Sequence, residues 1–105
     1  MVDKKYKSLK EFYPFYLSQH TNTTSRILHF IGTGLVVVCF FTGFLFHDFR
    51  FFIVTPILGY GFAWVGHYFF EKNKPATFTH PGYSLASDFI FFYDLLTGKQ
   101  SFKVR

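Results

Sequence analysis

The sequence predicts an all-α membrane protein: a two-span transmembrane helical hairpin flanked by interfacial amphipathic helices. Half of the 105 residues are hydrophobic and 18 are phenylalanine, which is more apolar surface than a soluble domain of this length can bury. Two uncharged stretches, about 27–46 and 51–70, are each long enough to cross a hydrocarbon core of about 30 Å. We expect residues 1–105 to form a single membrane domain.

The two apolar stretches are predicted to pair as antiparallel helices. Only the short link from His47 to Arg50 separates them, and it carries the charges that both stretches lack. Pro56 falls near the start of the second helix, where a missing N–H is tolerated. Glycines in both stretches allow the two backbones to approach closely.

Two shorter segments, about 9–20 and 83–97, are predicted to lie in the membrane interface. Each mixes large apolar side chains with polar ones, and neither is long enough to span a bilayer. Pro14 allows a kink in the first segment, while Gly98 is typical of the end of a helix such as the second.

The basic residues are distributed asymmetrically along the chain. Of the 11 lysines and arginines, only Arg50 lies between the two predicted spans. The positive-inside rule therefore places both termini in the cytoplasm, and the protein is expected in the inner membrane of a bacterium or the endoplasmic reticulum of a eukaryote. The net charge of +5 fits this topology and contact with anionic lipids, and no pattern indicates nucleic-acid binding.

Four of the five histidines are predicted to gather at one membrane face. His29 lies 17 residues before the end of the first span and His67 lies 16 residues after the start of the second, so a hairpin brings both to the same depth. His20 and His80 lie just outside the spans on that side, whereas His47 lies at the opposite end.

A cluster of neutral imidazoles suits a transition metal such as zinc, iron, copper or nickel. Glu71, four residues after His67, and Asp88, on the last predicted helix, are candidates either to bind the metal or to accept a hydrogen bond from an imidazole. The alternative is that the histidines hydrogen-bond only to each other or to the backbone. Their spacing alone leaves both interpretations open.

The sequence excludes several other classes of site and leaves two alternative functions open. The single cysteine, Cys39, rules out an intramolecular disulfide and a cysteine-based zinc motif. The sequence contains neither a Gly-x-Ser-x-Gly nucleophile motif nor a phosphate-binding glycine loop. Two other functions compete with a metal enzyme: a haem-binding membrane anchor with His29 and His67 as the axial pair, and a non-enzymatic small membrane module.

Several motifs together resemble one known family. They are Phe12-Tyr13-Pro14-Phe15-Tyr16-Leu17 before His20, R-I-L-H-F-I-G from Arg26 to Gly32, Gly66-His67, the run from Glu71 to Phe78, His80-Pro81 and Asp88-Phe89. From about Phe12 to Gly98 the chain resembles the membrane family once known only as a domain of unknown function. That family includes the fungal 2-hydroxy fatty acid dioxygenase of phytosphingosine breakdown.

The resemblance implies an iron(II)-dependent dioxygenase of lipid and sphingolipid metabolism that uses O2 to shorten a 2-hydroxy fatty acid by one carbon (α-oxidation). The metal ligands it implies are His20, His29, His67 and His80, with zinc as the alternative metal because imidazole suits both. Arg26 and Lys74 are candidates to attract the carboxylate of the substrate. A chain of 105 residues leaves little protein around a site at membrane depth, and this also favours a homodimer.

Overall fold

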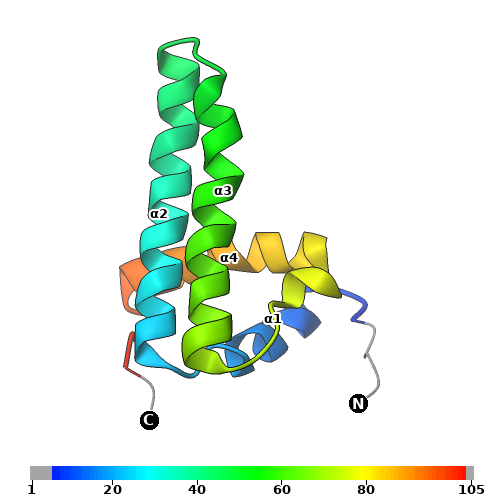
Figure 1. The fold of residues 1–105 in the computed structure, drawn as a ribbon. Helices are drawn as coiled ribbons and strands as arrows, with labels where there is room; N and C mark the ends of the chain where they lie inside the picture. The colour runs from blue at the N-terminus through cyan, green and yellow to red at the C-terminus, as the bar shows by residue number, and fades with distance from the viewer. Residues whose placement is uncertain (1–5, 104–105) are drawn as a thin grey trace.

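The computed structural model describes residues 6–103, apart from the side chain at position 77, and over that range the fold is all-helical and has no strand. Its elements are α1 (Leu9–Ser18), α2 (Thr23–Leu45), α3 (Arg50–Val65), the π-helix η1 (Gly66–Glu71), the short 3-10 helix η2 (Ala76–Phe78) and α4 (Pro81–Thr97). α2 and α3 form a long antiparallel hairpin, and α1 and α4 lie across its base (Figure 1). The predicted all-helical class is confirmed.

The hairpin supplies one clear membrane-span candidate. α2, with 23 residues, is the helix in the described range that is long and apolar enough to cross a membrane, judged by length and composition. α3 itself has 16 residues, and the π-helix η1 continues it for six more. The second predicted span is therefore not confirmed by this criterion, although its residues are helical.

Local signals explain where the helices begin and end. The Ser8 side chain accepts a hydrogen bond from the Glu11 N–H at the start of α1, and the Asn22 side chain does the same for the Ser25 N–H at the start of α2. α4 begins with Pro81 in its first turn and ends at Gly98, whose φ of 85° is accessible to a residue without a Cβ.

The two long helices touch where glycine removes a side chain. A Cβ placed on Gly32 of α2 would lie 2.7 Å from the Cβ of Phe62 on α3. This is closer than carbon atoms approach without displacement, so the contact between the two backbones depends on glycine here. The close approach predicted from the glycines of the apolar stretches is confirmed.

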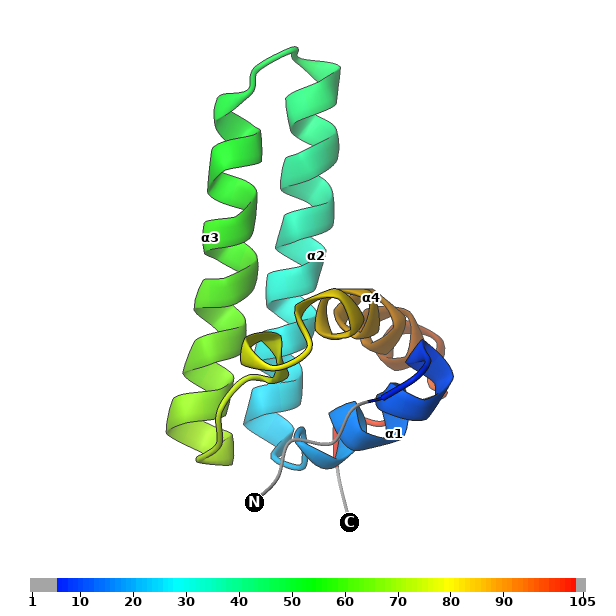
Figure 2. The same cartoon turned by 90° about the vertical axis from the view of Figure 1, so that its right-hand side faces the viewer.

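The buried core sits at the base of the hairpin, where α1 and α4 pack beside it (Figure 2). Its hydrophobic members are Phe12, Tyr16, Ala76, Phe91 and Leu95. The other end of the hairpin is uncovered and exposes large apolar side chains, among them Val38 (64%), Phe41 (63%), Leu45 (77%) and Ile57 (66%). The molecule thus has a packed base, which contains most of its buried polar groups, and an apolar arm.

Candidate metal centre

Three histidines from three different segments meet in the base. His20 follows α1, His29 lies on α2 and His67 lies in η1, and their exposed fractions are only 0%, 4% and 3%. Each offers a ring nitrogen, and these nitrogens all lie within 4.8 Å of one another. The Nε2 atoms of His20 and His29 are 3.0 Å apart. Three buried histidines this close could hold a metal ion.

The Nδ1 atom of each ring faces an oxygen acceptor. The Tyr16 carbonyl lies 2.7 Å from His20 Nδ1, and the Ser25 carbonyl lies 3.1 Å from His29 Nδ1. A carbonyl oxygen can only accept a hydrogen bond, so both Nδ1 atoms carry the proton. The Nε2 atoms of these two rings therefore present their lone pairs to the cluster.

Asn73 places the proton of the third ring on Nδ1 as well. Its Oδ1 lies 2.6 Å from His67 Nδ1, while its Nδ2 donates to the Gln19 carbonyl at 3.0 Å. The second bond identifies which end of the amide is nitrogen, so the atom facing His67 is an oxygen. His67 Nδ1 is thus the donor, and its Nε2 is available as a ligand.

This donor set fits a divalent transition metal. With Nδ1 protonated on both rings, the 3.0 Å contact between His20 and His29 has no hydrogen between its two nitrogens and brings two lone pairs together. A cation among the three Nε2 atoms would turn that repulsion into coordination. Neutral imidazoles whose second nitrogen donates to an oxygen are the common ligands of zinc and iron.

The packing of the rings does not fit a haem. The His20 ring centroid lies 4.3 Å from that of His29 and 4.5 Å from that of His67, and the latter two are 5.0 Å apart. A haem held by His29 and His67 would need its flat macrocycle between their rings. The three rings leave no such gap.

Tyr16 joins the cluster to α4. Its ring stacks on His20 with centroids 4.2 Å apart, and its hydroxyl donates to Asp88 Oδ1 at 2.5 Å.

Burial lowers the pKa of His20 well below its usual value, and the neighbouring His29 and His67 lower it further, so His20 is neutral at physiological pH. Burial raises the pKa of Asp88 to about 7.

Arg26 positions the loop that carries His20. This arginine is 6% exposed; its Nε donates to the His20 carbonyl at 2.7 Å and its guanidinium donates to the Ser101 carbonyl at 2.6 Å. It was predicted to attract a substrate carboxylate. In the structure its hydrogen bonds hold the start of α2 to the segment after α4.

A family model described as 2-hydroxy-palmitic acid dioxygenase Mpo1-like matches residues 6–100. The chain belongs to this Mpo1-like family. The family resemblance predicted from the histidine motifs is therefore confirmed, and the family name describes a dioxygenase-like enzyme. No curated protein and no solved structure gives a significant match.

Not every residue assigned to the site by sequence enters the cluster of the Mpo1-like chain. His80 is outside the group of three: its ring packs against Tyr6 and Phe12, with centroids 5.3 and 5.2 Å away, and its Nδ1 lies 2.8 Å from the Thr79 hydroxyl. Lys74 is exposed in the link between η1 and η2. His47 lies in the turn between α2 and α3.

The two carboxylates predicted to support the histidines have different positions. Glu71 accepts hydrogen bonds from the Thr21 N–H at 3.0 Å and the Asn22 N–H at 2.9 Å, so it fastens the loop between α1 and α2 to the end of η1. Asp88 reaches His20 only through the Tyr16 ring. The acceptor on His67 is Asn73, which sequence reasoning missed although it lies within the Glu71–Phe78 motif.

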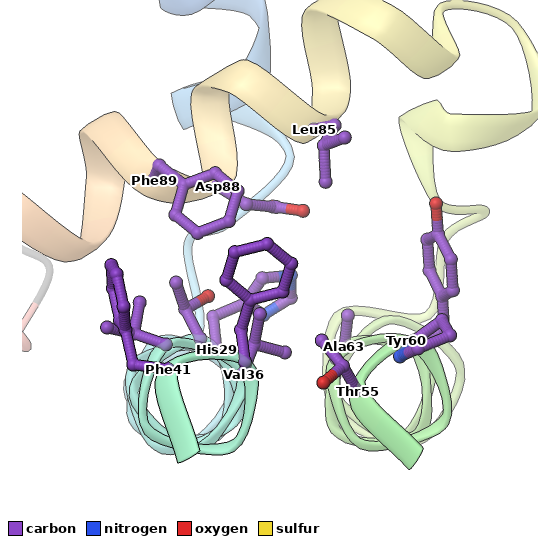
Figure 3. A pocket seen from close by; sticks show the side chains of 14 residues that line it. His29, Val36, Phe41, Thr55, Tyr60, Ala63, Leu85, Asp88 and Phe89 are labelled. Atoms are coloured by element: carbon purple, nitrogen blue, oxygen red, sulfur yellow. The ribbon is translucent and has the colours of Figure 1, made fainter. Parts of the chain in front are cut away.

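An apolar cavity of about 570 Å³ adjoins the cluster. It lies between the hairpin and α4, with His29 and Asp88 in its wall (Figure 3). Its volume is within the usual range for small-molecule sites. The cluster is therefore joined, through His29, to a space large enough for an organic ligand.

Proposed function

We propose that this chain is an iron(II)-dependent dioxygenase that α-oxidises 2-hydroxy fatty acids at a membrane. The observation that carries the proposal is the cluster of three buried imidazoles, His20, His29 and His67, each with an oxygen at Nδ1 that leaves Nε2 available to bind a metal. Membership of the Mpo1-like family supports the substrate class. Iron held by three imidazoles would supply open coordination positions for O2 and substrate.

The proposed reaction balances without another reductant. The bond between C1 and C2 of the 2-hydroxy acid breaks, C1 leaves as carbon dioxide and C2 becomes the carboxyl carbon of an acid shortened by one carbon. One O2 is consumed and one water is formed, because the four electrons that reduce O2 come from the oxidation of C1 and C2.

The chain's own residues hold the ligands still and keep bulk water away. The Tyr16 and Ser25 carbonyls and the Asn73 amide keep a proton on Nδ1 of the three rings, which leaves Nε2 to bind the metal. Phe91 packs against His20 with ring centroids 5.4 Å apart and closes the cluster on the α4 side. We assign metal binding to these three histidines and a packing role to His80.

We further propose that the hairpin is inserted in the membrane through both α2 and the helical segment formed by α3 and η1. The exposed apolar arm supports this placement, because side chains such as Phe41 and Ile57 would be costly in water. The exposed lysines of the described range lie towards the base, just before α1, in α1 and in the segments that follow η1 and α4. The base is then cytoplasmic, at the inner membrane of a bacterium or the endoplasmic reticulum of a eukaryote.

The first test is metal analysis of the chain purified in detergent without oxygen, together with its visible spectrum. We expect about one iron per chain and no haem band. Stoichiometric zinc that iron cannot replace would contradict the dioxygenase while leaving the metal site in place. A chain that binds no metal even after anaerobic loading with iron would contradict both.

The second test is turnover of 2-hydroxyhexadecanoic acid with O2, followed by mass spectrometry of the product. His20→Ala, His29→Ala and His67→Ala should each abolish metal binding and formation of the shortened acid. His47→Ala, in the distant turn, is the matched control and should keep both. His80→Ala should keep the metal, because its ring lies outside the cluster; loss of metal in this variant would show that the ligand set is larger than three.

A further inference from the structure

The cavity beside the metal cluster is polar at one end and apolar along its length. His29 and Asp88 form the polar end, next to the other two histidines of the cluster. The other polar side chains in the wall are Thr33, one turn along α2 from His29, and Thr55 and Tyr60 on α3; the Thr55 hydroxyl donates to the Phe51 carbonyl at 2.7 Å, and the rest of the wall is apolar. A ligand that fits this cavity therefore has one polar end and a long apolar remainder.

The hairpin gives the cavity its length. α2 contributes lining residues at successive turns, from His29 through Val37 to Phe41, and α3 contributes Ala63 and Pro56 on the opposite side. His29 and Phe41 are 12 residues apart on one helix, which corresponds to about 18 Å. An extended alkyl chain advances roughly 1.3 Å per carbon, because its bonds of about 1.5 Å zigzag, so about 14 carbons span this distance.

α4 covers only the polar end of this path. Its lining residues are Leu85, Asp88 and Phe89, and it crosses the hairpin near the base while the arm extends well beyond it (Figures 1 and 3). The far end of the cavity is bordered by Phe41, which is 63% exposed on the apolar arm. An alkyl chain could therefore enter from the side of the arm without passing through water.

Resting on the proposed function, we propose that this cavity binds the acyl chain of the substrate in one direction. The carboxyl and 2-hydroxyl groups lie at the His29 and Asp88 end, and the tail follows the groove between α2 and α3 towards Phe41. Ala63 and Val37 then determine specificity for chain length, because each lies beside a different part of the tail. The chemical class of ligand is a long, single-chain 2-hydroxy acid taken from the bilayer.

Substitution at two depths tests this direction. Val37 is eight residues from His29 on α2, or about 12 Å, which corresponds to about nine carbons. Ala63 is four residues from His67 on the opposite side of the hairpin, or about 6 Å, which corresponds to about five carbons. A phenylalanine at either position fills the groove at that depth.

The measurement is equilibrium binding of 2-hydroxyoctanoic and 2-hydroxyhexadecanoic acids to the zinc-loaded full chain, by native mass spectrometry from detergent. No oxidation is needed for this readout. Val37→Phe should weaken binding of the longer acid by at least about tenfold and leave the shorter acid within about twofold, since each methylene removed from apolar contact costs a factor of about four. Ala63→Phe should weaken both acids.

Ile57→Phe is the matched control, because Ile57 lies on the same helix as Ala63 but is 66% exposed and outside the cavity wall. The Ile57→Phe variant should bind both acids with the affinity of the unmodified chain. Equal effects of Val37→Phe on the two acids, or none on either, would overturn the proposed direction, as would failure of the unmodified chain to bind the longer acid. If binding follows the expected pattern but iron and O2 give no shortened product, the cavity assignment stands and the proposed function fails.

Discussion

Asn73 does with its side chain what Tyr16 and Ser25 do with main-chain carbonyls. All three place an oxygen against Nδ1 of a clustered imidazole, at 2.6, 2.7 and 3.1 Å. The two carbonyls belong to helical backbone and cannot be removed by a substitution. Asn73 is therefore the position at which the support of one ligand can be changed while all three histidines are kept.

We expect Asn73→Leu to weaken metal affinity by about 10–100-fold, because His67 loses the acceptor that fixes its tautomer and ring orientation. Zinc affinity measured against a competing chelator gives the result. Asn73→Asp keeps an acceptor oxygen and should retain affinity within a few-fold of the unmodified chain. If both substitutions weaken metal affinity equally, Asn73 acts through its hydrogen bond to the Gln19 carbonyl and not through the acceptor that it offers to His67.

Asp88 should make stability depend on pH in a direction unusual for a carboxyl group. Burial raises its pKa to about 7, so the folded chain holds this proton more tightly than the unfolded chain, whose aspartate titrates near about 4. The tighter binding of this proton adds to the free energy of unfolding; the added stability is fully present below about pH 4 and is lost as the pH rises through about 7.

Asp88→Asn removes that titration, so the Tm of the unmodified chain minus the Tm of the variant should fall as the pH rises from 4 to 7. Thermal unfolding in detergent, followed by circular dichroism in matched buffers, measures the difference. Comparing the two chains at each pH cancels the opposite contribution of His20, whose lowered pKa favours the folded chain at higher pH. A difference that does not change with pH would contradict the assigned pKa.

At the scale of elements, the sequence predicted the two long helices well and the π-helix not at all. Apolar stretches 27–46 and 51–70 correspond to α2 and to α3 with η1. A regular helix would put Glu71 on the same face as His67, four residues earlier, which is why Glu71 was assigned to the imidazole. The wider turn of η1 and the left-handed Lys72 (φ 62°) after it bring Asn73 to His67 instead.

Gly66, the first residue of η1, lets the segment that carries His67 lie against α2. A Cβ at this position would lie 2.9 Å from the Ser25 hydroxyl oxygen and 3.4 Å from the Ser25 Cα. The second neighbour is backbone and cannot rotate away. The Ser25 carbonyl also supports His29, so the contact joins two of the three ligands.

Gly66→Val should therefore lower stability by about 1–3 kcal/mol through overpacking and weaken metal affinity at the same time. Gly61→Val, in the preceding helix α3, is the control, because a Cβ there meets nothing within 4 Å. Thermal unfolding and zinc competition on both variants give the comparison. If the two valines have equal effects, the contact between Gly66 and Ser25 does not position the ligands.

For the whole molecule, sequence reasoning predicted that His20, His29 and His67 meet, but it also included His80, which the structure places outside the group of three. A hairpin places His29 and His67 at one depth by counting residues, and His20 is tied to them by the short link between α1 and α2. The position of His80 depends on how the chain folds back through η2 before α4, and its ring packs on α1 at Phe12. Such long-range packing carries no periodic signal in the sequence.

Metal binding should stabilise the entire base, because the ligands come from the loop after α1, from α2 and from η1. At a free zinc concentration of about 100 times Kd, the expected gain is about 2.7 kcal/mol. Thermal unfolding with zinc and after chelation should show a rise in Tm that His20→Ala abolishes. A rise that persists in this variant would place the binding elsewhere.

The topology can be tested with single cysteines in a Cys39→Ser background. The two substitutions are Phe49→Cys, in the turn of the hairpin, and Lys99→Cys, at the base. The native side chains at both positions are exposed. With the chain expressed in the inner membrane of a bacterium, a membrane-impermeant maleimide applied to intact cells should label the first position and leave the second unlabelled until the membrane is opened. Labelling of Lys99→Cys in intact cells would reverse the proposed orientation.

The separation of His20, His29 and His67 along the chain also sets an order of events during biosynthesis. The first two ligands are synthesised before α3 exists, and the third belongs to a segment that returns to the base only after the hairpin has closed. A ribosome-bound fragment ending in the turn at residues 46–49 would hold two of the three imidazoles and lack Asn73. With the proposed insertion of both helices, metal capture is expected to follow that insertion, so the ion would reach a chain already embedded in its membrane.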